Sequence, residues 1–194
     1  MLSSRKKADV QVGEKMMKYL VVVDMQNDFV DGSLGTKEAV AIVEAVAEKI
    51  RNHEGKVIFT FDTHDDNYED TQEGKNLPVR HCIAGTEGWK LNPIIDALQD
   101  NLEIEGRATD LEKVTFGSKD IGSFLVSENN KEKIDSIELV GLCTDVCVIS
   151  NAMIIKAFLP ETPIIVDSKC CAGVTPESHE TALNAMRACQ IAIV

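Results

Sequence analysis

Short apolar runs alternate along this chain with segments whose apolar residues recur at helical spacing, and this alternation constrains the fold more than any other feature. The run at 19–23 is apolar throughout, which is typical of a strand buried on both faces of a sheet. Residues 37–52 then carry apolar side chains every three or four positions, between Thr36 as a helix N-cap and Gly55 as a stop. This order predicts the α/β class: a single-domain parallel β-sheet flanked by helices on both faces.

The same reasoning assigns the rest of the chain. The expected strands cover residues 19–23, 56–61, 103–104, 113–116, 137–140, 163–166 and 190–194. The expected helices cover residues 37–52, 92–98, 118–126, 144–158 and 176–188. Residues 62–90 are rich in Asp, Asn, Gly and Thr and predict a loop long enough to have a function. Residues 1–16 are polar and are expected to be a flexible leader or tag, which leaves residues 17–194 as one domain.

Composition narrows the choice of partners and compartment. The formal net charge of −12 argues against nucleic acid, because phosphate binding needs concentrated positive charge. No apolar run approaches the roughly 20 residues that span a bilayer, so no membrane partner is expected. Residues 1–16 lack the apolar segment of a secretory signal, so we expect a cytoplasmic protein whose six cysteines stay reduced. None of these cysteines forms a C-x-x-C pair, which argues against a structural zinc site.

Polar groups follow several of the expected strands. Asp24 and Asp62 come directly after the first two, and the turn at 143–147 follows the strand at 137–140. Lys113 lies at one end of a short strand. Because ligands bind outside the carboxyl ends of the strands in such sheets, these groups are candidates for a shared site.

Cys147 lies in the first turn of the expected helix at 144–158. Free N–H groups and the helix dipole there favour a thiolate, while Asp24 can supply a base and Lys113 a cation. Amide groups of residues 143–147 can form an oxyanion hole. The alternative is that Cys147 is a small buried apolar side chain, Asp24 a strand-end cap and Lys113 a surface charge. Spacing alone leaves both interpretations open.

Five motifs occur in a fixed order: VVVDMQNDF at 21–29, FDTH at 61–64, HCIAGTEGW at 81–89, KVTFGS at 113–118 and GLCTDVCV at 141–148. With these motifs the chain resembles the isochorismatase-like cysteine hydrolases, and most of all their nicotinamidase (pyrazinamidase) branch. The resemblance runs from about residue 17 to the C-terminus. True isochorismatases resemble the chain in fold but lack the cysteine.

The resemblance implies a role for each matching residue. Asp24 matches the family's catalytic aspartate, Lys113 its lysine and Cys147 its nucleophile. The Leu142–Cys143 bond matches a cis peptide, and the backbone amides of Cys143 and Cys147 match the oxyanion hole. Phe29 matches an aromatic wall of the substrate pocket.

The resemblance also implies a divalent metal ion. Asp62, His64 and His81 match three of its ligands, whereas the family's second loop histidine has no counterpart in this chain. Glu73 is the candidate replacement, with Asp70 as the fallback. A carboxylate among these ligands favours zinc, with manganese or iron(II) as alternatives. The tryptophan that often precedes the motif histidine is absent as well, since residues 77–79 read Leu-Pro-Val.

The expected function is a cysteine-dependent amidohydrolase, a nicotinamidase that converts nicotinamide to nicotinate and ammonia through a thioester, as in NAD salvage. One alternative keeps the same residues but hydrolyses another small amide or a carbamoyl compound. An alternative of another class is a thiol redox or binding protein that uses an exposed, low-pKa Cys147. The expected partner is a small-molecule amide, and the resemblance implies a homo-oligomer.

Overall fold

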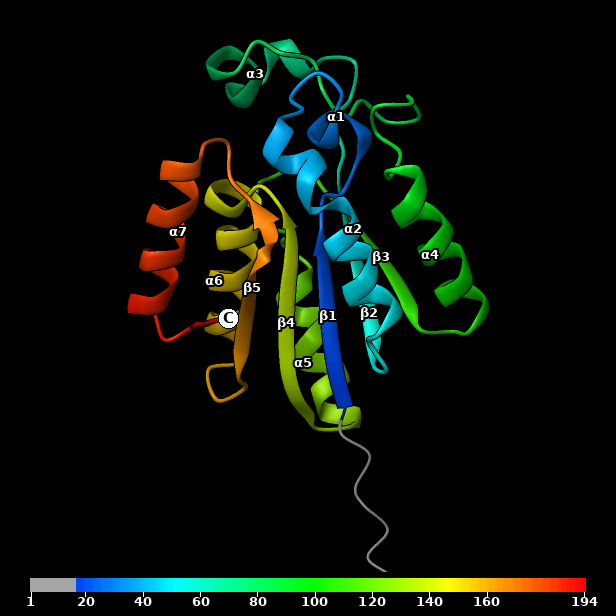
Figure 1. The fold of residues 1–194 in the computed structure, drawn as a ribbon, viewed down its shortest axis with the longest axis vertical. Coiled ribbons are helices and arrows are strands. Elements are labelled where there is room, and N and C mark those ends of the chain that lie inside the picture. Colours follow the sequence, from blue (N-terminus) through cyan, green and yellow to red (C-terminus); the bar gives the residue numbers. More distant parts are fainter. Residues whose placement is uncertain (1–16) are drawn as a thin grey trace, which may run out of the picture.

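The computed structural model describes residues 17–194, so the leader expected at 1–16 lies outside the described residues. Six parallel strands form one sheet in the order β3-β2-β1-β4-β5-β6 (Figure 1). The strands are β1 (Met17–Val23), β2 (Lys56–Asp62), β3 (Ala108–Lys113), β4 (Ile134–Leu142), β5 (Ile164–Ala172) and β6 (Ala192–Ile193). The chain winds outward from β1 to β3 and then returns to the other side of β1. This reversal creates a switch point between the carboxyl ends of β1 and β4, where ligands bind in open α/β sheets.

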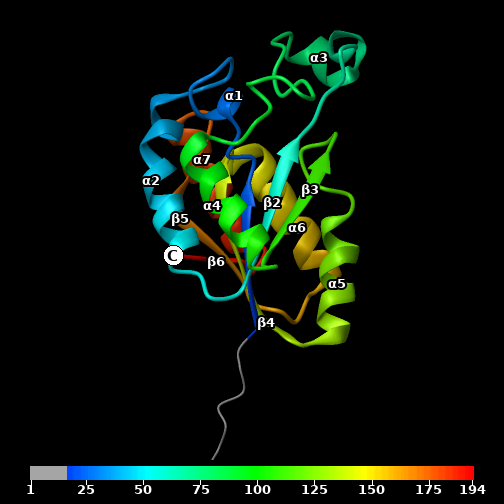
Figure 2. The same cartoon turned by 90° about the vertical axis from the view of Figure 1, so that its right-hand side faces the viewer.

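Helices cover both faces of the sheet, which confirms the predicted fold class (Figures 1 and 2). Alternate residues of β1 enter the two cores: Leu20 and Val22 pack beneath α2 and α4, while Val21 and Val23 pack beneath α5, α6 and α7. The helices are α1 (Asn27–Val30), α2 (Lys37–Arg51), α3 (Gln72–Asn76), α4 (Pro93–Ile104), α5 (Ile121–Lys131), α6 (Ile149–Phe158) and α7 (Pro176–Ala188). Among the described residues, no helix is both long and apolar enough to cross a membrane.

Several local predictions are confirmed. Thr36 caps α2, because its hydroxyl accepts a hydrogen bond from the amide of Ala39 at 3.0 Å. The helix ends at Arg51 with Asn52 as its C-cap, so the expectation that Gly55 stops it is wrong. Helix α7 has the predicted bounds and begins with Pro176. Thr175 is its N-cap, and the side chains of Thr175 and Ser178 form a capping box.

Other local predictions are wrong. Residues 103–104 are the last turn of α4 rather than a strand, because α4 continues past residue 98 to bury Leu102. The strand expected at 113–116 is instead β3, which runs from Ala108 to Lys113. Strand β3 lies at an edge of the sheet and is only partly buried, so its sequence has no continuous apolar run.

The loop at 62–90 also contains short structure that was not predicted. Tyr68–Asp70 forms a 3₁₀ turn and α3 follows it directly. Residues 144–158 are not one α-helix: Thr144–Val148 forms a π-helical turn, and α6 begins after it. Single π-helical turns are frequent at functional sites.

Candidate active site

Polar side chains from four neighbouring strands meet at one edge of the sheet. Asp24 follows β1, Asp62 and Lys113 are the last residues of β2 and β3, and Cys143 follows β4. Asp62 and Lys113 are paired across the two strands. Since all strands are parallel, their carboxyl ends reach the same edge, and this edge contains the switch point between β1 and β4.

Lys113 is the central residue of this site. Its Nζ lies 2.7 Å from Asp24 Oδ2, 3.2 Å from Asp62 Oδ1 and 3.6 Å from Cys147 Sγ. All four side chains are buried, and Cys147 is 4% exposed. The structure therefore brings together the three residues that the motifs assign to catalysis, out of contact with bulk water.

Asp24 is held in a specific orientation. Its backbone has φ of +46°, which is uncommon for a residue other than glycine, and its amide donates a hydrogen bond to Thr60 Oγ1. The Thr60 hydroxyl donates in turn to Asp24 Oδ1 at 2.6 Å. Oδ2 is buried and has no aligned hydrogen bond among residues 17–194, so beyond its ion pair with Lys113 it keeps a free lone pair. This oxygen can accept a proton.

Sequence reasoning did not identify Thr60. The available signal was a hydroxyl residue inside the otherwise apolar strand VIFTF at 57–61. Thr60 is fully buried, and a buried hydroxyl needs a hydrogen-bond partner.

Burial sets the protonation states of the site. It raises the pKa of Asp24, and the nearby Lys113 ammonium opposes this rise only in part. It also raises the pKa of the Cys147 thiol well above its usual value, and the Asp24 carboxylate adds to the effect. Burial by itself lowers the pKa of Lys113, but the charges of Asp24 and the neighbouring groups outweigh it, so the pKa is raised and the amine stays charged. The Cys147 thiol is therefore neutral in the resting site, rather than the thiolate expected from the helix N-terminus.

The turn that carries Cys147 begins at an unusual backbone. The Leu142–Cys143 peptide bond is cis. Gly141, just before it, has φ of +114°, and a Cβ at this position would lie 2.2 Å from the carbonyl oxygen of Val23. Only glycine lets β4 approach β1 so closely at the switch point. The carbonyl of Cys143 then accepts a hydrogen bond from the amide of Val148 at 3.0 Å, which closes the wide π-helical turn.

Side chains in and next to the turn tie it to its surroundings. Thr144 is fully buried, and its Oγ1 lies 2.8 Å from Nδ1 of His179 on α7. The Asp145 carboxylate accepts a hydrogen bond from the amide of Val174 at 3.1 Å. On the other side, the Asn151 amide donates to the carbonyl of Cys147 at 2.9 Å. His179 also escaped sequence reasoning, because nothing in the spacing of α7 links it to residue 144.

A second cluster adjoins Lys113 through Asp62. One ligand atom from each of Asp62, His64, Glu73 and His81 lies within 4.8 Å of the other three. His64 Nε2 is 3.0 Å from Asp62 Oδ2 and 3.6 Å from Glu73 Oε1. Glu73 therefore reaches the cluster from α3, whereas the fallback Asp70 is an exposed residue of the 3₁₀ turn.

The donor atoms of this cluster suit a divalent metal ion. His64 Nε2 is buried without a hydrogen-bond partner in the described part of the chain, and a metal ion would satisfy it. His81 Nδ1 lies 2.8 Å from the carbonyl oxygen of Val79, which leaves Nε2 facing the carboxylates. Phe29 is 8% exposed and packs edge-on against His81, with 5.4 Å between ring centroids. It thus borders the cluster at His81.

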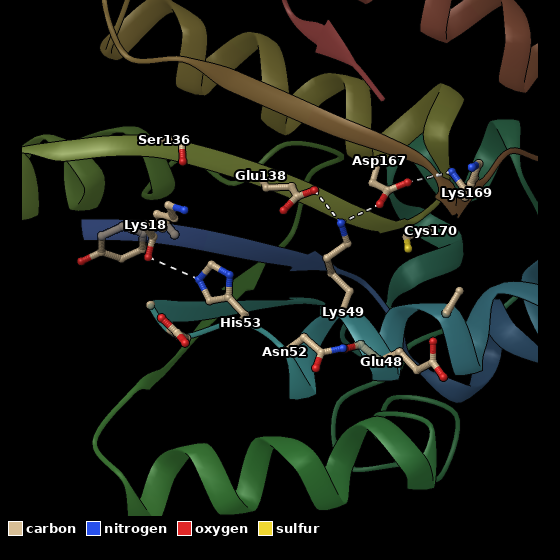
Figure 3. A pocket seen from close by; sticks show the side chains of 14 residues that line it. Lys18, Glu48, Lys49, Asn52, His53, Ser136, Glu138, Asp167, Lys169 and Cys170 are labelled. Atoms are coloured by element: carbon tan, nitrogen blue, oxygen red, sulfur yellow. Dashed lines mark hydrogen bonds and ion pairs between the residues drawn. The ribbon is translucent and has the colours of Figure 1, made fainter. Parts of the chain in front are cut away.

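A cavity lined by other residues lies away from this site. It has a volume of about 890 Å³ and opens between α2 and the strands β1, β4 and β5 (Figure 3). Its polar side chains include Lys49, Glu138 and Asp167, and neither Cys147 nor any residue of the metal cluster lines it. The chemistry-bearing groups are therefore those at the carboxyl edge of the sheet.

Comparison with known proteins gives one family. The isochorismatase domain model matches residues 18–194. An uncharacterized isochorismatase family protein from Bacillus subtilis is 32% identical over 176 residues, which is 87% of this chain and 93% of the relative. The solved structure of a nicotinamidase/pyrazinamidase from Bacillus subtilis has a TM-score of 0.78 at 26% identity, over 92% of this chain and 100% of that one. A pyrazinamidase from Pyrococcus horikoshii, solved in complex with zinc, has a TM-score of 0.72 at 25% identity, over 91% and 98% of the two chains.

Proposed function

The chain belongs to the isochorismatase family, and we propose that it is a metal-assisted nicotinamidase that hydrolyses nicotinamide to nicotinate and ammonia. The observation that carries this proposal is the buried contact of Lys113 with Asp24, Asp62 and Cys147, directly beside a four-residue metal cluster. A nucleophile, a base and an electrophilic site next to one another are what hydrolysis of a small amide requires.

The first half of the reaction is acylation of Cys147. Because the resting thiol is neutral, it needs a base, and the raised pKa of Asp24 makes this carboxylate a stronger base than an ordinary aspartate. Asp24 takes the thiol proton while Sγ attacks the carbonyl carbon of the amide. The backbone amides of Cys143 and Cys147 stabilise the oxyanion, and Lys113 stabilises the negative charge that moves between Sγ and the carboxylate. Asp24 then gives its proton to the leaving nitrogen, the C–N bond breaks, and ammonia departs from a thioester.

The second half is hydrolysis of the thioester. Asp24, again a carboxylate, takes a proton from a water molecule that attacks the carbonyl carbon. The C–S bond breaks, the carboxylic acid leaves, and Asp24 returns the proton to Sγ. Thr60 keeps the carboxylate in one orientation during both steps, since its hydroxyl binds Oδ1 and leaves Oδ2 for the proton.

Asp62, His64, Glu73 and His81 would hold the metal ion, with zinc as the first candidate and manganese or iron(II) as alternatives. When bound, the ion would supply a Lewis acid that orients the ring nitrogen of the substrate. Phe29, packed on His81, would form one wall against the ring. Glu73 in place of a third histidine adds a negative charge, which favours metals that accept mixed nitrogen and oxygen ligands.

The alternative of a thiol redox protein receives no support from the site. That function needs an accessible thiol of low pKa, whereas Cys147 is almost fully buried and its pKa is raised. It also leaves the contacts of Lys113 with two carboxylates without a purpose.

We further propose a cytoplasmic location and a homo-oligomeric state. All six cysteines are free, and the nucleophile must stay reduced to act, so a reducing compartment suits the protein. Light scattering on the purified protein would establish the number of subunits.

The proposed function is tested by ammonia release from nicotinamide, with and without a chelator, for the native protein and for Cys147→Ala. We expect release that depends on Cys147 and is lost on chelation. Full activity of Cys147→Ala would rule out the nucleophile, and activity that survives complete metal removal would rule out the role of the metal.

A further inference from the structure

A cleft of about 690 Å³ lies beside the metal cluster and is not used by the proposed mechanism. It opens between the segment that contains α3 and the residues that follow β3. Its volume falls in the range of about 300–1,000 Å³ that is typical of small-molecule sites. It is lined by Thr63, His64, Asp65, Asn67, Tyr68, Thr71, Gln72, Glu73, Asn76, Leu77, Val114, Thr115 and Phe116.

The cleft adjoins the metal cluster. His64 and Glu73 belong both to its lining and to the metal cluster. From His64 a chain of side-chain contacts leads to Cys147: His64 Nε2 is 3.0 Å from Asp62, whose carboxylate is 3.2 Å from Lys113, and Lys113 is 3.6 Å from Cys147 Sγ. A ring that reaches the cluster while its amide lies at Cys147 therefore presents its far side to this cleft.

The outer wall of the cleft is apolar. Leu77, Val114 and Phe116 are 38%, 61% and 48% exposed, and they come from two different segments of the chain. Single exposed apolar residues need no explanation, but three that line one cleft beside a reactive site indicate a binding surface.

The charges of the cleft exclude an anionic ligand. Neither lysine nor arginine lines it, whereas Asp65 and Glu73 do, and the chain as a whole carries a net charge of −12. A phosphate group placed at the outer wall of the cleft, away from the metal cluster, would face carboxylates with no lysine or arginine beside it. This argues against an amide that carries a nucleotide or sugar-phosphate group.

Both walls are internally fixed, so the cleft exists before a ligand binds. The Tyr68 hydroxyl donates a hydrogen bond to the carbonyl of Leu77 at 2.9 Å, and Thr71 caps α3 through the amide of Gly74. On the opposite wall, the Thr115 hydroxyl donates to the carbonyl of Gly117 at 2.7 Å. A preformed apolar surface costs little conformational entropy when a ligand covers it.

We propose that this cleft binds an apolar substituent on the ring of the carboxamide substrate, so that the enzyme prefers aromatic amides larger than nicotinamide. The inference rests on the proposed function, because it assumes that an amide is hydrolysed at Cys147. The inference adds a surface that determines specificity, formed by Leu77, Val114 and Phe116, which contacts the side of the substrate away from the reacting carbonyl.

The test compares three probes: nicotinamide, and pyridine-3-carboxamide with a phenyl group at C5 or at C6. We expect at least one phenyl compound to have a kcat/KM about tenfold above that of nicotinamide, as burial of an aromatic group allows. Phe116→Ser should lower the ratio of kcat/KM for the preferred phenyl compound to kcat/KM for nicotinamide about tenfold. Ile104→Ser is the matched control, since Ile104 is an 86% exposed apolar residue at the end of α4, and it should leave the ratio unchanged.

Thermal unfolding of each variant shows whether it is folded, and Val114→Ser replaces Phe116→Ser if the latter is not. Two results would overturn the cleft inference and leave the proposed nicotinamidase function standing. One is hydrolysis of nicotinamide without any preference for a phenyl compound. The other is a ratio of kcat/KM values in Phe116→Ser equal to that of the native protein. Hydrolysis of a phenyl compound alone would support the cleft and replace nicotinamide as the substrate. No hydrolysis of any probe would overturn the proposed function, and the inference with it.

Discussion

Removing the charge of the Lys49 side chain tests how much a partly buried ion-pair network away from the active site contributes to the free energy of unfolding. Lys49 Nζ lies 2.8 Å from Glu138 Oε1 and 2.7 Å from Asp167 Oδ2, and so joins α2 to β4 and β5 across the large cavity (Figure 3). The three side chains are 28%, 21% and 13% exposed. In Lys49→Met, two carboxylates would face each other without a cation.

The expected loss lies between two measured limits. Exposed ion pairs contribute about 0–1 kcal/mol, whereas breaking a fully buried pair costs about 3–5 kcal/mol. Since these side chains are mostly but not fully buried, we expect Lys49→Met to lower the free energy of unfolding by about 2 kcal/mol. For a chain of this length that corresponds to a fall in Tm of about 4–8 °C.

The pH dependence of this loss follows from Asp167. Burial by itself raises the pKa of Asp167, but the hydrogen bonds from Lys49 and from the Lys169 amide, together with the charge of Lys49, outweigh it and hold the pKa below its usual value. A carboxyl group whose pKa is lowered by folding stabilises the native state above its unfolded pKa of about 3.9, and this stabilisation is lost as the pH falls through the folded pKa. The difference in Tm between the native protein and Lys49→Met should therefore be full at neutral pH and should narrow below about pH 4.

Thermal unfolding followed by circular dichroism at several pH values measures both effects. Lys90→Met is the matched control, because the Lys90 side chain is 52% exposed and, within residues 17–194, forms an ion pair only with Glu87. It should change the free energy of unfolding by less than about 0.5 kcal/mol. Lys49→Met should keep its amidase activity, since the cavity does not include the catalytic groups. An unchanged Tm at neutral pH, or a difference that widens in acid, would refute this reasoning.

Three further predictions concern the active site. The pKa of Asp24 is raised by burial, so kcat/KM should rise with pH on its acid limb with a midpoint above the ordinary aspartate pKa of about 4. Asp24→Asn should be nearly inactive. A pH–rate profile checks both, and an unaffected rate in Asp24→Asn would remove Asp24 from the mechanism. Glu73→Gln should bind zinc at least tenfold more weakly than the native protein in a competition assay with a chromophoric chelator. Asp70→Asn is the control and should bind zinc as tightly as the native protein. Equal zinc affinities of the two variants would exclude Glu73 as a ligand. His179→Leu should lower kcat about tenfold with little change in KM, because it frees the turn that carries Cys147. His179→Asn keeps a polar atom near the Nδ1 position and should recover most of the loss. Equal rates in both variants would mean that the contact with Thr144 does not position the nucleophile.

Local sequence was sufficient for much of the fold. Continuous apolar runs and helical spacing are determined by which faces a segment must bury, and β1, α2 and α7 were predicted from these patterns with bounds close to those observed. Strand β3 was misplaced because it lies at the sheet edge, where only part of the strand is buried and charged residues are tolerated.

The sequence by itself also placed the site at the carboxyl ends of the strands, since motifs that follow strands are brought together by any parallel sheet. It did not determine the electrostatics of that site. The pKa values of Asp24 and Cys147 depend on burial and on the charge of Lys113, which is far away in the sequence and adjacent in space. The contacts of Thr60 and His179 likewise join residues 36 and 35 positions away from their partners. Only the packed structure creates the low-dielectric environment that raises the pKa values of the Cys147 thiol and of Asp24, because solvent exposure and distance through space are properties of the whole fold.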